Sequence, residues 1–431
     1  MKNLIVGRCQ MASENIFALQ EGEYYIFLNI ESFRDVRVHR SQIFINGKLN
    51  KKIEEISEPI HTESSINVEM CKLINPTFVL DFNCNYHCEY CYQKNMRLNS
   101  GNMTEEHIDG IGRFYDYFCK KNNIEKKFGE INIIGGEPFL ESNRRTIEYI
   151  SQKWADSPLC FTTNGTNVIS YLDFLVKRKT RIKVSLDGTK QMHYSRRKTK
   201  DKYAFEKTID GIKELLKNNK DVQIVTVFDY SMLEGYSGFF SLMESLGWGS
   251  NPKLKIAFIP QFNSGCDDII DLRKTVDSFL RLNEKDNRTQ MVDARKLFPG
   301  SIVFENIMRK KQCGEIGCSP YRCSCLYYPD YWFLPDGTVH FCFYTKSEKT
   351  LIGKYFPQVE FDQEKIVQLK NRRIDFIEKC KNCKYRFLCR GGCAISSLQR
   401  TGTIYNEDCM LWKDAFFVKH YDKVLKIRSK I

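Results

Sequence analysis

Short apolar runs and amphipathic stretches alternate along the middle of the chain, over residues 76–262. Segments such as 104–120, 145–155 and 203–217 carry apolar residues at helical spacing. Six intervening runs are apolar on both faces, which is typical of strands in a buried parallel sheet. They are TFVLDFN (77–83), EINIIGG (130–136), CFTTN (160–164), IKVSLDG (182–188), VQIVTVF (222–228) and KIAFIP (255–260). The alternation predicts βαβ units and an α/β fold, a partial (β/α)6 barrel.

The pattern changes on both sides of this region. Residues 1–75 contain the apolar runs YYIFLNI and SQIFINGKL before a polar segment, which predicts a small β-containing N-terminal unit. Residues 263–312 read as a helical, charged connector, and residues 313–431 as a cysteine-rich domain dominated by loops. A length of 431 residues fits two or three domains.

Composition and charge narrow the class of protein. A hydrophobic content of 42% and a charged content of 28% are typical of a soluble globular protein. No run of about 18 apolar residues predicts a membrane span, and the N-terminus lacks a signal peptide, so we expect a cytoplasmic protein without a membrane partner. The net charge of +13 comes from scattered basic residues, so it does not by itself indicate nucleic-acid binding.

Cysteine is the most informative residue type. Eighteen cysteines in a cytoplasmic chain are not expected to form disulfides. Five stand alone and are predicted to be small buried hydrophobes: Cys9, Cys71, Cys119, Cys160 and Cys266. The other thirteen fall within 84–91 and 313–409, and clustered thiols in a reducing compartment indicate metal.

The first group, Cys84, Cys88 and Cys91, directly follows the first predicted strand. A structural zinc site needs four protein ligands, and His87 is a possible fourth. A cubane iron–sulfur cluster held by three thiolates instead leaves one iron open to a small molecule, which explains why three cysteines suffice.

The sequence CNYHCEYC resembles the CxxxCxΦC motif of the radical S-adenosylmethionine (radical SAM) superfamily, with Tyr90 as the aromatic Φ. The resemblance continues in family order with GGEP (135–138), TTNG (162–165) and SLDGTKQMHYSRR (185–197), all at predicted strand ends. It implies a 4Fe–4S cluster on the three cysteines, with S-adenosylmethionine at the open iron. Cleavage of S-adenosylmethionine then gives a 5′-deoxyadenosyl radical that abstracts hydrogen from the substrate.

The resemblance also implies how S-adenosylmethionine is bound. Gly135 and Gly136 allow close backbone approach, Glu137 helps to hold the methionine ammonium, and Tyr90 covers the adenine edge. The alternative for GGEP is a βα turn with an acidic helix start. Thr163 and Asn164 are explained equally well by ordinary turn chemistry.

Ser185 and Arg197 match the family positions that bind the methionine carboxylate, and a guanidinium suits this task because it can grip two oxygens. Arg196 is adjacent and could take the role instead. Asp187 either supports the ribose side or caps the strand end. His193 is expected to be structural or to face the substrate, and no catalytic acid or base is assigned.

The C-terminal cysteines have an equally distinctive spacing. Cys380, Cys383, Cys389 and Cys393 form CxxCxxxxxCxxxC, Cys409 follows, and Gly337 stands five positions before Cys342. This pattern resembles the SPASM extension of radical SAM enzymes, which implies two auxiliary 4Fe–4S clusters. A zinc ribbon is the alternative, although it would use paired CxxC knuckles.

Family topology implies a ligand set for each auxiliary cluster. The cluster nearer the barrel takes Cys342, Cys393 and two thiols of the loop 313–325. Cys325 is the first choice there and Cys318 the second, while Cys313 and Cys323 stay open. The distal cluster takes Cys380, Cys383, Cys389 and Cys409.

SPASM-bearing relatives usually act on peptides and proteins, so the resemblance implies modification of a ribosomally made peptide by a thioether or carbon–carbon crosslink, or a related oxidation. An electron donor such as flavodoxin or ferredoxin is implied as a partner. Residues 1–75 either bind a leader segment of the peptide as an added β-strand or form a simple cap.

Two alternative functions stay open. The first is an anaerobic sulfatase maturase that forms formylglycine. Many of these enzymes carry an Asp after the cysteine equivalent to Cys342, where this chain has Phe343. The second is a non-enzymatic iron–sulfur or zinc scaffold that binds nucleic acid, against which GGEP and Arg197 argue.

Overall fold

The computed structural model describes a defined part of the chain, which divides into two compact units. The described residues are 9–11, 16–29, 35–57, 73–96, 101–228, 235–260, 323–342, 347–383, 386 and 390–409. The first unit comprises the described residues of 73–260 and 323–370, and the second those of 9–57 and 371–409. The predicted connector at 263–312 lies outside the described residues.

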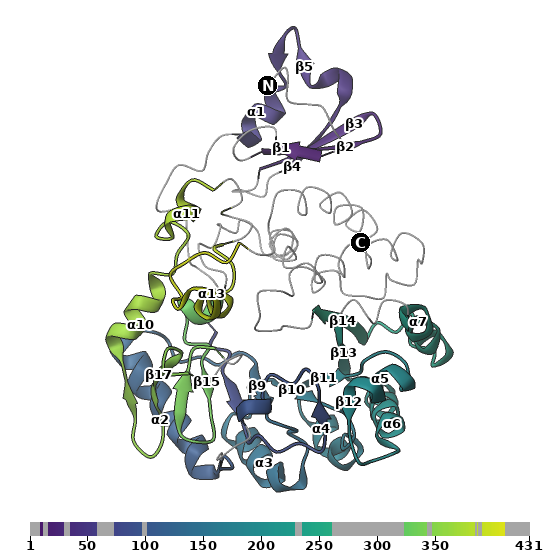
Figure 1. Cartoon of the computed structure of the whole chain (residues 1–431), viewed down its shortest axis with the longest axis vertical. Coiled ribbons are helices and arrows are strands. Elements are labelled where there is room, and N and C mark those ends of the chain that lie inside the picture. Colours follow the sequence, from purple (N-terminus) through teal and green to yellow (C-terminus); the bar gives the residue numbers. More distant parts are fainter. Residues whose placement is uncertain are drawn as a thin grey trace. The chain divides into compact units, whose positions relative to one another are not determined.

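The first unit is built on six parallel strands that follow one another in chain order across the sheet (Figure 1). They are β7 (Thr77–Val79), β9 (Ile131–Ile134), β10 (Leu159–Thr163), β11 (Thr180–Ser185), β13 (Asp221–Phe228) and β14 (Leu254–Pro260). Every neighbouring pair is parallel. The six strands coincide with the six apolar runs of the sequence, so the predicted α/β fold is confirmed.

Helices follow the strands and line one side of this sheet in Figure 1. They are α2 (Glu105–Asn122), α3 (Arg144–Lys153), α4 (Leu172–Lys177), α5 (Lys190–Arg196), α6 (Ala204–Lys217) and α7 (Tyr236–Ser245). The longest, α2, starts at a capping box between Thr104 and His107 and ends at Asn123, which has a left-handed φ of 52°. Its buried residues include Ile111, Phe114 and Phe118, which recur at helical spacing.

The same sheet continues beyond the barrel strands. β15 (Trp332–Phe333) pairs in parallel with β7, and β16 (Thr338–His340), β17 (Leu351–Lys354) and β18 (Glu360–Phe361) add on in antiparallel order. Helix α10 (Gln363–Lys370) follows. Phe333 joins the core through edge-on contact with Phe114, at 5.3 Å between ring centroids. Residues 323–370, which the sequence places in the cysteine-rich domain, thus extend the barrel sheet.

The second unit contains the predicted N-terminal β-structure. Strands β1 (Cys9–Met11), β2 (Ile16–Glu21), β3 (Tyr24–Asn29) and β4 (Asp35–His39) form an antiparallel sheet in that order. A short hairpin, β5 (Phe44–Ile45) and β6 (Lys48–Leu49), precedes α1 (Lys51–Ser57). Buried residues of the sheet and of α1 form one hydrophobic core, which includes Phe27, Val38 and Ile53.

The cysteine-rich part of the second unit has little regular structure. It contains α11 (Glu378–Lys381) and α13 (Ala394–Thr401), joined by loops. Across the described ranges, no helix combines the length and the apolar character that a membrane span requires.

Candidate functional site

The cysteine loop begins just after β7, at the carboxyl end of the first barrel strand. Cys84, Cys88 and Cys91 are half-buried and form no disulfide. Within the loop, β8 (His87–Cys88) pairs antiparallel with β12 (Arg197–Lys198), so Cys88 lies opposite Arg197. The backbone N–H of Cys91 donates to the carbonyl of Cys88 at 3.2 Å. The sheet pairing therefore fixes the three-thiol loop to the segment that carries the predicted carboxylate-binding arginine.

The arrangement of these thiols differs from that of a single-ion site. Among the residues that the structure describes, no three Cys, His, Asp or Glu side chains meet closely enough to bind one metal ion. His87, the possible fourth zinc ligand, is exposed. A cubane cluster binds each thiolate through a different iron, so its ligands stand farther apart than those of one ion. Three half-buried thiols on one loop fit such a cluster.

The two glycines of GGEP pack directly against the backbone of the cysteine loop. A Cβ atom on Gly136 would lie 2.0 Å from the carbonyl oxygen of Asn83, and one on Gly135 would lie 3.1 Å from that of Asp81. The N–H groups of Gly136 and Glu137 donate to the carbonyls of Asp81 and Asn83, at 3.0 and 2.7 Å. The close approach of these two chain segments therefore requires glycine at position 136 and leaves little room for a side chain at position 135.

The carboxylate of Glu137 is fully buried and held by three donors. Its Oε1 accepts hydrogen bonds from the Thr163 hydroxyl at 2.6 Å and from the backbone N–H of Phe139 at 3.0 Å, and its Oε2 accepts one from the N–H of Asn164 at 2.7 Å. Burial raises the pKa of Glu137 to about 7, although these hydrogen bonds and the charge of Arg197 act in the opposite direction.

Thr163 and Asn164 thus do more than complete a turn. Beyond its contact with Glu137, Asn164 donates from Nδ2 to Oδ1 of Asn85 at 2.7 Å and lies 3.9 Å from the Cys84 sulfur. These residues link the third strand end to both GGEP and the cysteine loop. Sequence reasoning did not identify this role, and the available signal was the position of TTNG beside GGEP in the predicted sheet.

Tyr90, Asp187 and Arg197 form a buried polar cluster. Nη1 of Arg197 donates to the Tyr90 hydroxyl at 2.6 Å, and the same hydroxyl donates to Oδ2 of Asp187. Arg197 and Asp187 also form an ion pair, with 3.7 Å between Nη1 and Oδ2, and both side chains are buried. Oδ1 of Asp187 accepts a hydrogen bond from the N–H of Val227 at 3.0 Å. The hydroxyl of Tyr90 therefore connects the cysteine loop to the predicted carboxylate-binding arginine.

Arg197 retains hydrogen-bonding capacity within this cluster. Its Nε atom is buried and has no hydrogen-bond partner among the described residues. Arg196, the alternative, donates from Nη1 to the carbonyl of Val227 at 2.8 Å, and its guanidinium lies over the Tyr90 ring. Ser185 is half-buried at the last position of β11. The geometry thus favours Arg197 over Arg196 as the residue available to an anionic ligand.

His193 has a structural environment. Its ring is fully buried, with Nε2 at 3.3 Å from the Tyr86 hydroxyl, and its Nδ1 accepts a hydrogen bond from the N–H of Asp187 at 3.4 Å. Burial, together with the positive charge of Arg197, lowers the pKa of His193 well below its usual value. A neutral histidine with both nitrogens engaged supports the turn that carries Asp187.

A second group of thiols lies in the barrel unit. Cys325 is hydrogen-bonded to Cys323, and this bond, with burial and the nearby thiols of Cys323 and Cys342, raises the pKa of Cys325 well above its usual value. The structure therefore brings together Cys325 and Cys342, as the sequence predicts, and adds Cys323, which the sequence left open. Cys313 and Cys318 lie outside the described residues.

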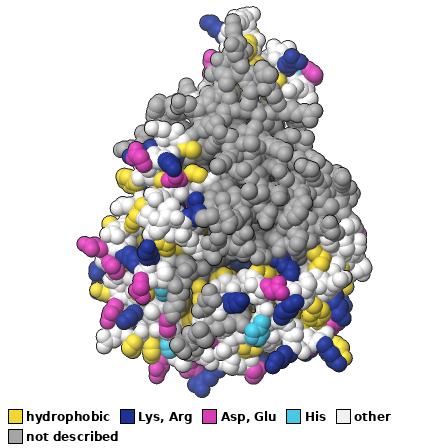
Figure 2. All heavy atoms as spheres, in the orientation of Figure 1, with side chains coloured by type: hydrophobic (Ala, Val, Ile, Leu, Met, Phe, Trp, Pro, Cys, Tyr) yellow, Lys and Arg dark blue, Asp and Glu magenta, His cyan; other side chains and the backbone are white. Residues whose placement is uncertain are grey.

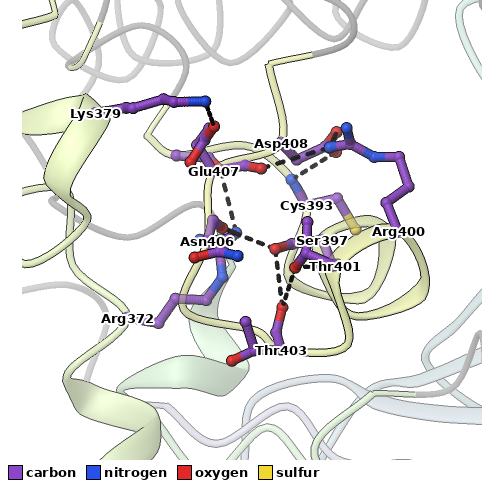
Figure 3. Close-up of polar contacts among 11 residues, drawn as sticks. Arg372, Lys379, Cys393, Ser397, Arg400, Thr401, Thr403, Asn406, Glu407 and Asp408 are labelled. Atoms are coloured by element: carbon purple, nitrogen blue, oxygen red, sulfur yellow. Dashed lines mark hydrogen bonds and ion pairs between the residues drawn. The ribbon is translucent and has the colours of Figure 1, made fainter.

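A third group lies in the second unit. The thiols of Cys409 and Cys383 are near Cys380, and burial and these two thiols raise the pKa of Cys380 to about 12. Cys393 precedes α13, and its N–H donates to Oδ2 of Asp408 at 3.2 Å (Figure 3). Cys389 lies outside the described residues. Three of the four thiols predicted for the distal cluster are thus neighbours.

Comparison with known proteins identifies the first unit. Residues 82–236 match the model of the radical SAM superfamily, so this part of the chain is a radical SAM domain. The superfamily uses a 4Fe–4S cluster and S-adenosylmethionine, which are the cofactors predicted from the sequence. The chain is accordingly an enzyme that contains a radical SAM domain.

Longer similarities extend beyond this domain. The chain is 24% identical over 383 residues to a cysteine-type anaerobic sulfatase-maturating enzyme of Clostridium novyi (strain NT), covering 81% of this chain and 95% of that protein. The structure of anSMEcpe with bound AdoMet and a Kp18Cys peptide is similar with a TM-score of 0.61, at 18% identity, over 83% of this chain and 100% of that one. Streptococcus suis SuiB bound to its precursor peptide SuiA is similar with a TM-score of 0.54, at 14% identity, over 94% of this chain and 100% of that one.

Proposed function

We propose that this radical SAM enzyme modifies a ribosomally made peptide by forming a thioether or carbon–carbon crosslink, or by a related oxidation. The observation that carries the proposal is the four-stranded N-terminal sheet, β1 to β4, which precedes the barrel in the chain. The similarity to SuiB, a protein that binds a precursor peptide, covers 94% of this chain, against 83% for anSMEcpe. A peptide substrate is consistent with both relatives, since each has been seen with a peptide bound.

Residues of the barrel would hold the cofactors. Cys84, Cys88 and Cys91 would bind the 4Fe–4S cluster, which supplies the electron that cleaves S-adenosylmethionine. Arg197, held by Tyr90 and Asp187, would grip the methionine carboxylate together with Ser185. Glu137 would accept the methionine ammonium, because its buried carboxylate lies at the strand end beside the cysteine loop.

The remaining thiols would hold auxiliary clusters. Cys323, Cys325 and Cys342 would belong to one set, and Cys380, Cys383 and Cys409 to another, with Cys389 as the fourth ligand of the second set. An auxiliary cluster can take up the electron that a substrate radical gives up, which makes the net reaction a two-electron oxidation. An external protein such as flavodoxin or ferredoxin would reduce the catalytic cluster.

The N-terminal sheet would bind the leader of the peptide. Among the described strands, β1 and β4 lie at the edges of this sheet, and each therefore has one side on which a peptide strand could add by backbone hydrogen bonds. β1 has three residues and β4 has five, so β4 offers the longer edge.

The test is anaerobic co-expression with a short peptide encoded beside this chain, followed by mass spectrometry. A crosslink or dehydrogenation removes two hydrogens from the peptide, and the proposal expects this loss only with an intact cysteine loop. An unchanged peptide mass and unchanged stereochemistry would count against the proposal.

Sulfatase maturation is the second candidate, because the Clostridium relatives match 81% of this chain. In many such maturases an Asp follows the cysteine equivalent to Cys342. This chain has Phe343 at that position, which cannot accept a proton, so a maturase reaction would need another base. Phe343 itself lies outside the described residues. His193 and His340 are the candidates to replace such a base. His340 is buried, with Nδ1 at 3.0 Å from the Thr350 hydroxyl and Nε2 at 3.1 Å from the Thr338 hydroxyl. We therefore expect no formylglycine on a sulfatase-derived Cys or Ser peptide, and its formation would promote this candidate.

A nucleic-acid-binding scaffold has less support. On the face drawn in Figure 2, described Lys and Arg side chains are interspersed with Asp and Glu side chains. A phosphate-binding surface usually gathers basic side chains on one face. Measuring iron content and production of 5′-deoxyadenosine separates a radical SAM enzyme from a binding scaffold, since a scaffold would not convert S-adenosylmethionine to 5′-deoxyadenosine.

A further inference from the structure

Arg372 is a fully buried arginine in the cysteine-rich unit. Its Nη2 donates hydrogen bonds to the backbone carbonyls of Gly391, at 3.1 Å, and Asn406, at 3.4 Å (Figure 3). Gly391 stands two residues before Cys393, and Asn406 stands three residues before Cys409. One guanidinium thus connects the segment before α11 with the two loops that carry these cysteines.

The same guanidinium lies close to the thiol of Cys380. A Cβ atom on Gly391 would lie 3.2 Å from Nη1 of Arg372 and 4.0 Å from the sulfur of Cys380. Gly391 has a φ of +75°, so both its missing side chain and its backbone conformation require glycine. The Cδ1 atom of Ile377 would lie nearest to this Cβ atom, at 2.7 Å, so the guanidinium and the sulfur both lie beside Gly391 together with an apolar side chain.

The guanidinium of Arg372 acts on the sulfur of Cys380 from a buried position. A buried charge acts more strongly on its neighbours than an exposed one, because little water screens it. The positive charge of Arg372 accordingly stabilises negative charge at the sulfur of Cys380.

The residues present fit an iron–sulfur cluster, since Cys380, Cys383 and Cys409 are neighbours; Cys380 is buried, Cys383 is half-buried and Cys409 is exposed. A cluster ligated by thiolates gains negative charge when it is reduced, and its reduction potential depends on nearby charge. We propose that Arg372 is a positioning residue of the distal auxiliary cluster, whose buried positive charge raises the reduction potential of that cluster and so favours uptake of an electron. The proposal rests on a cluster at these cysteines and is independent of the peptide substrate.

The test compares Arg372→Met with Arg373→Met in the full chain. Arg373 is the adjacent residue, but its side chain is partly exposed and pairs with Asp375. Both substitutions are made in a C84A/C88A/C91A background, which leaves only auxiliary clusters. Anaerobic redox titration followed by electron paramagnetic resonance then gives their potentials.

Arg372→Met should lower the reduction potential of one cluster and leave the others unchanged. At a fixed potential, the ratio of oxidised to reduced cluster should rise about tenfold, which corresponds to a shift of about 59 mV for one electron. Arg373→Met should leave every step unchanged. Full iron content with unchanged potentials in Arg372→Met would overturn the proposal.

Two further variants keep the test decisive. If Arg372→Met loses iron, its potential cannot be measured, and Arg372→Lys, which retains the charge, is tested in its place. A reduction potential of Arg372→Lys equal to that of the parent protein supports the proposal. Loss of iron in Arg372→Lys as well would mean that Arg372 acts by packing alone, which overturns it. Full iron in a C380A/C383A variant would show instead that no cluster is bound at these cysteines.

Discussion

The Tyr90 hydroxyl accepts a hydrogen bond of 2.6 Å from Nη1 of Arg197, and it donates in turn to Asp187. Tyr90 stands between Cys88 and Cys91, so a residue of the cysteine loop directly holds the arginine that we assign to S-adenosylmethionine binding. The sequence resemblance also implies that Tyr90 covers the adenine edge, which stays a prediction. The hydroxyl contact gives Tyr90 a role in positioning Arg197 that an aromatic ring alone would not supply.

Replacing Tyr90 by phenylalanine should weaken S-adenosylmethionine binding about tenfold, because a hydrogen bond to a buried charged group is lost. Anaerobic isothermal titration calorimetry measures the dissociation constant. Tyr117→Phe is the matched control, since Tyr117 is exposed on α2. Equal dissociation constants for the Tyr90→Phe variant and the parent protein would rule out this positioning role.

Binding of S-adenosylmethionine should also depend on pH through Glu137. Burial raises the pKa of this carboxyl to about 7, so below pH 7 the free protein carries a proton there. An ammonium group pairs with the charged form, so binding at low pH must first expel that proton. We expect about tenfold weaker binding at pH 6 than at pH 8.

The variant Glu137→Gln provides the control for this pH dependence. It should bind S-adenosylmethionine weakly at both pH values, with the difference between them largely removed. A Gln variant that keeps the full pH dependence would assign the titration to another group.

Gly136 should tolerate no side chain. An alanine Cβ would lie 2.0 Å from the Asn83 carbonyl oxygen, so the substitution must separate GGEP from the cysteine loop. We expect a loss of about 1–3 kcal/mol in stability, together with a lower iron content. Differential scanning calorimetry and iron analysis measure the two effects. Gly101→Ala should be neutral, because nothing lies within 4 Å of a Cβ atom there.

The sequence predicted the barrel well because each of its strands is a continuous apolar run. It also located the cysteine loop, GGEP and Arg197, since these carry short motifs at strand ends. It could not assign Thr163 and Asn164 to Glu137, because such contacts depend on which strands are neighbours and in which register. The extension by β15 to β18 was also missed, since strands of two to four residues show too little alternation to be recognised.

The grouping of the C-terminal thiols illustrates the same limit. The sequence favoured Cys325 and then Cys318 and left Cys313 and Cys323 open, whereas the fold places Cys323 next to Cys325. Replacing Cys325 and Cys342 together by alanine should therefore remove about one cluster's iron. Cys119→Ala is the control, since Cys119 is buried on α2, and it should retain full iron. Full iron in the double variant would show that these thiols are not ligands.

Production of 5′-deoxyadenosine from S-adenosylmethionine tests the central claim most directly. The anaerobically reconstituted protein, supplied with a reductant, should form 5′-deoxyadenosine, and the C84A/C88A/C91A variant should form none. Chromatography with mass detection measures the product. Bound zinc without turnover in the parent protein, or normal turnover in the triple variant, would contradict the account.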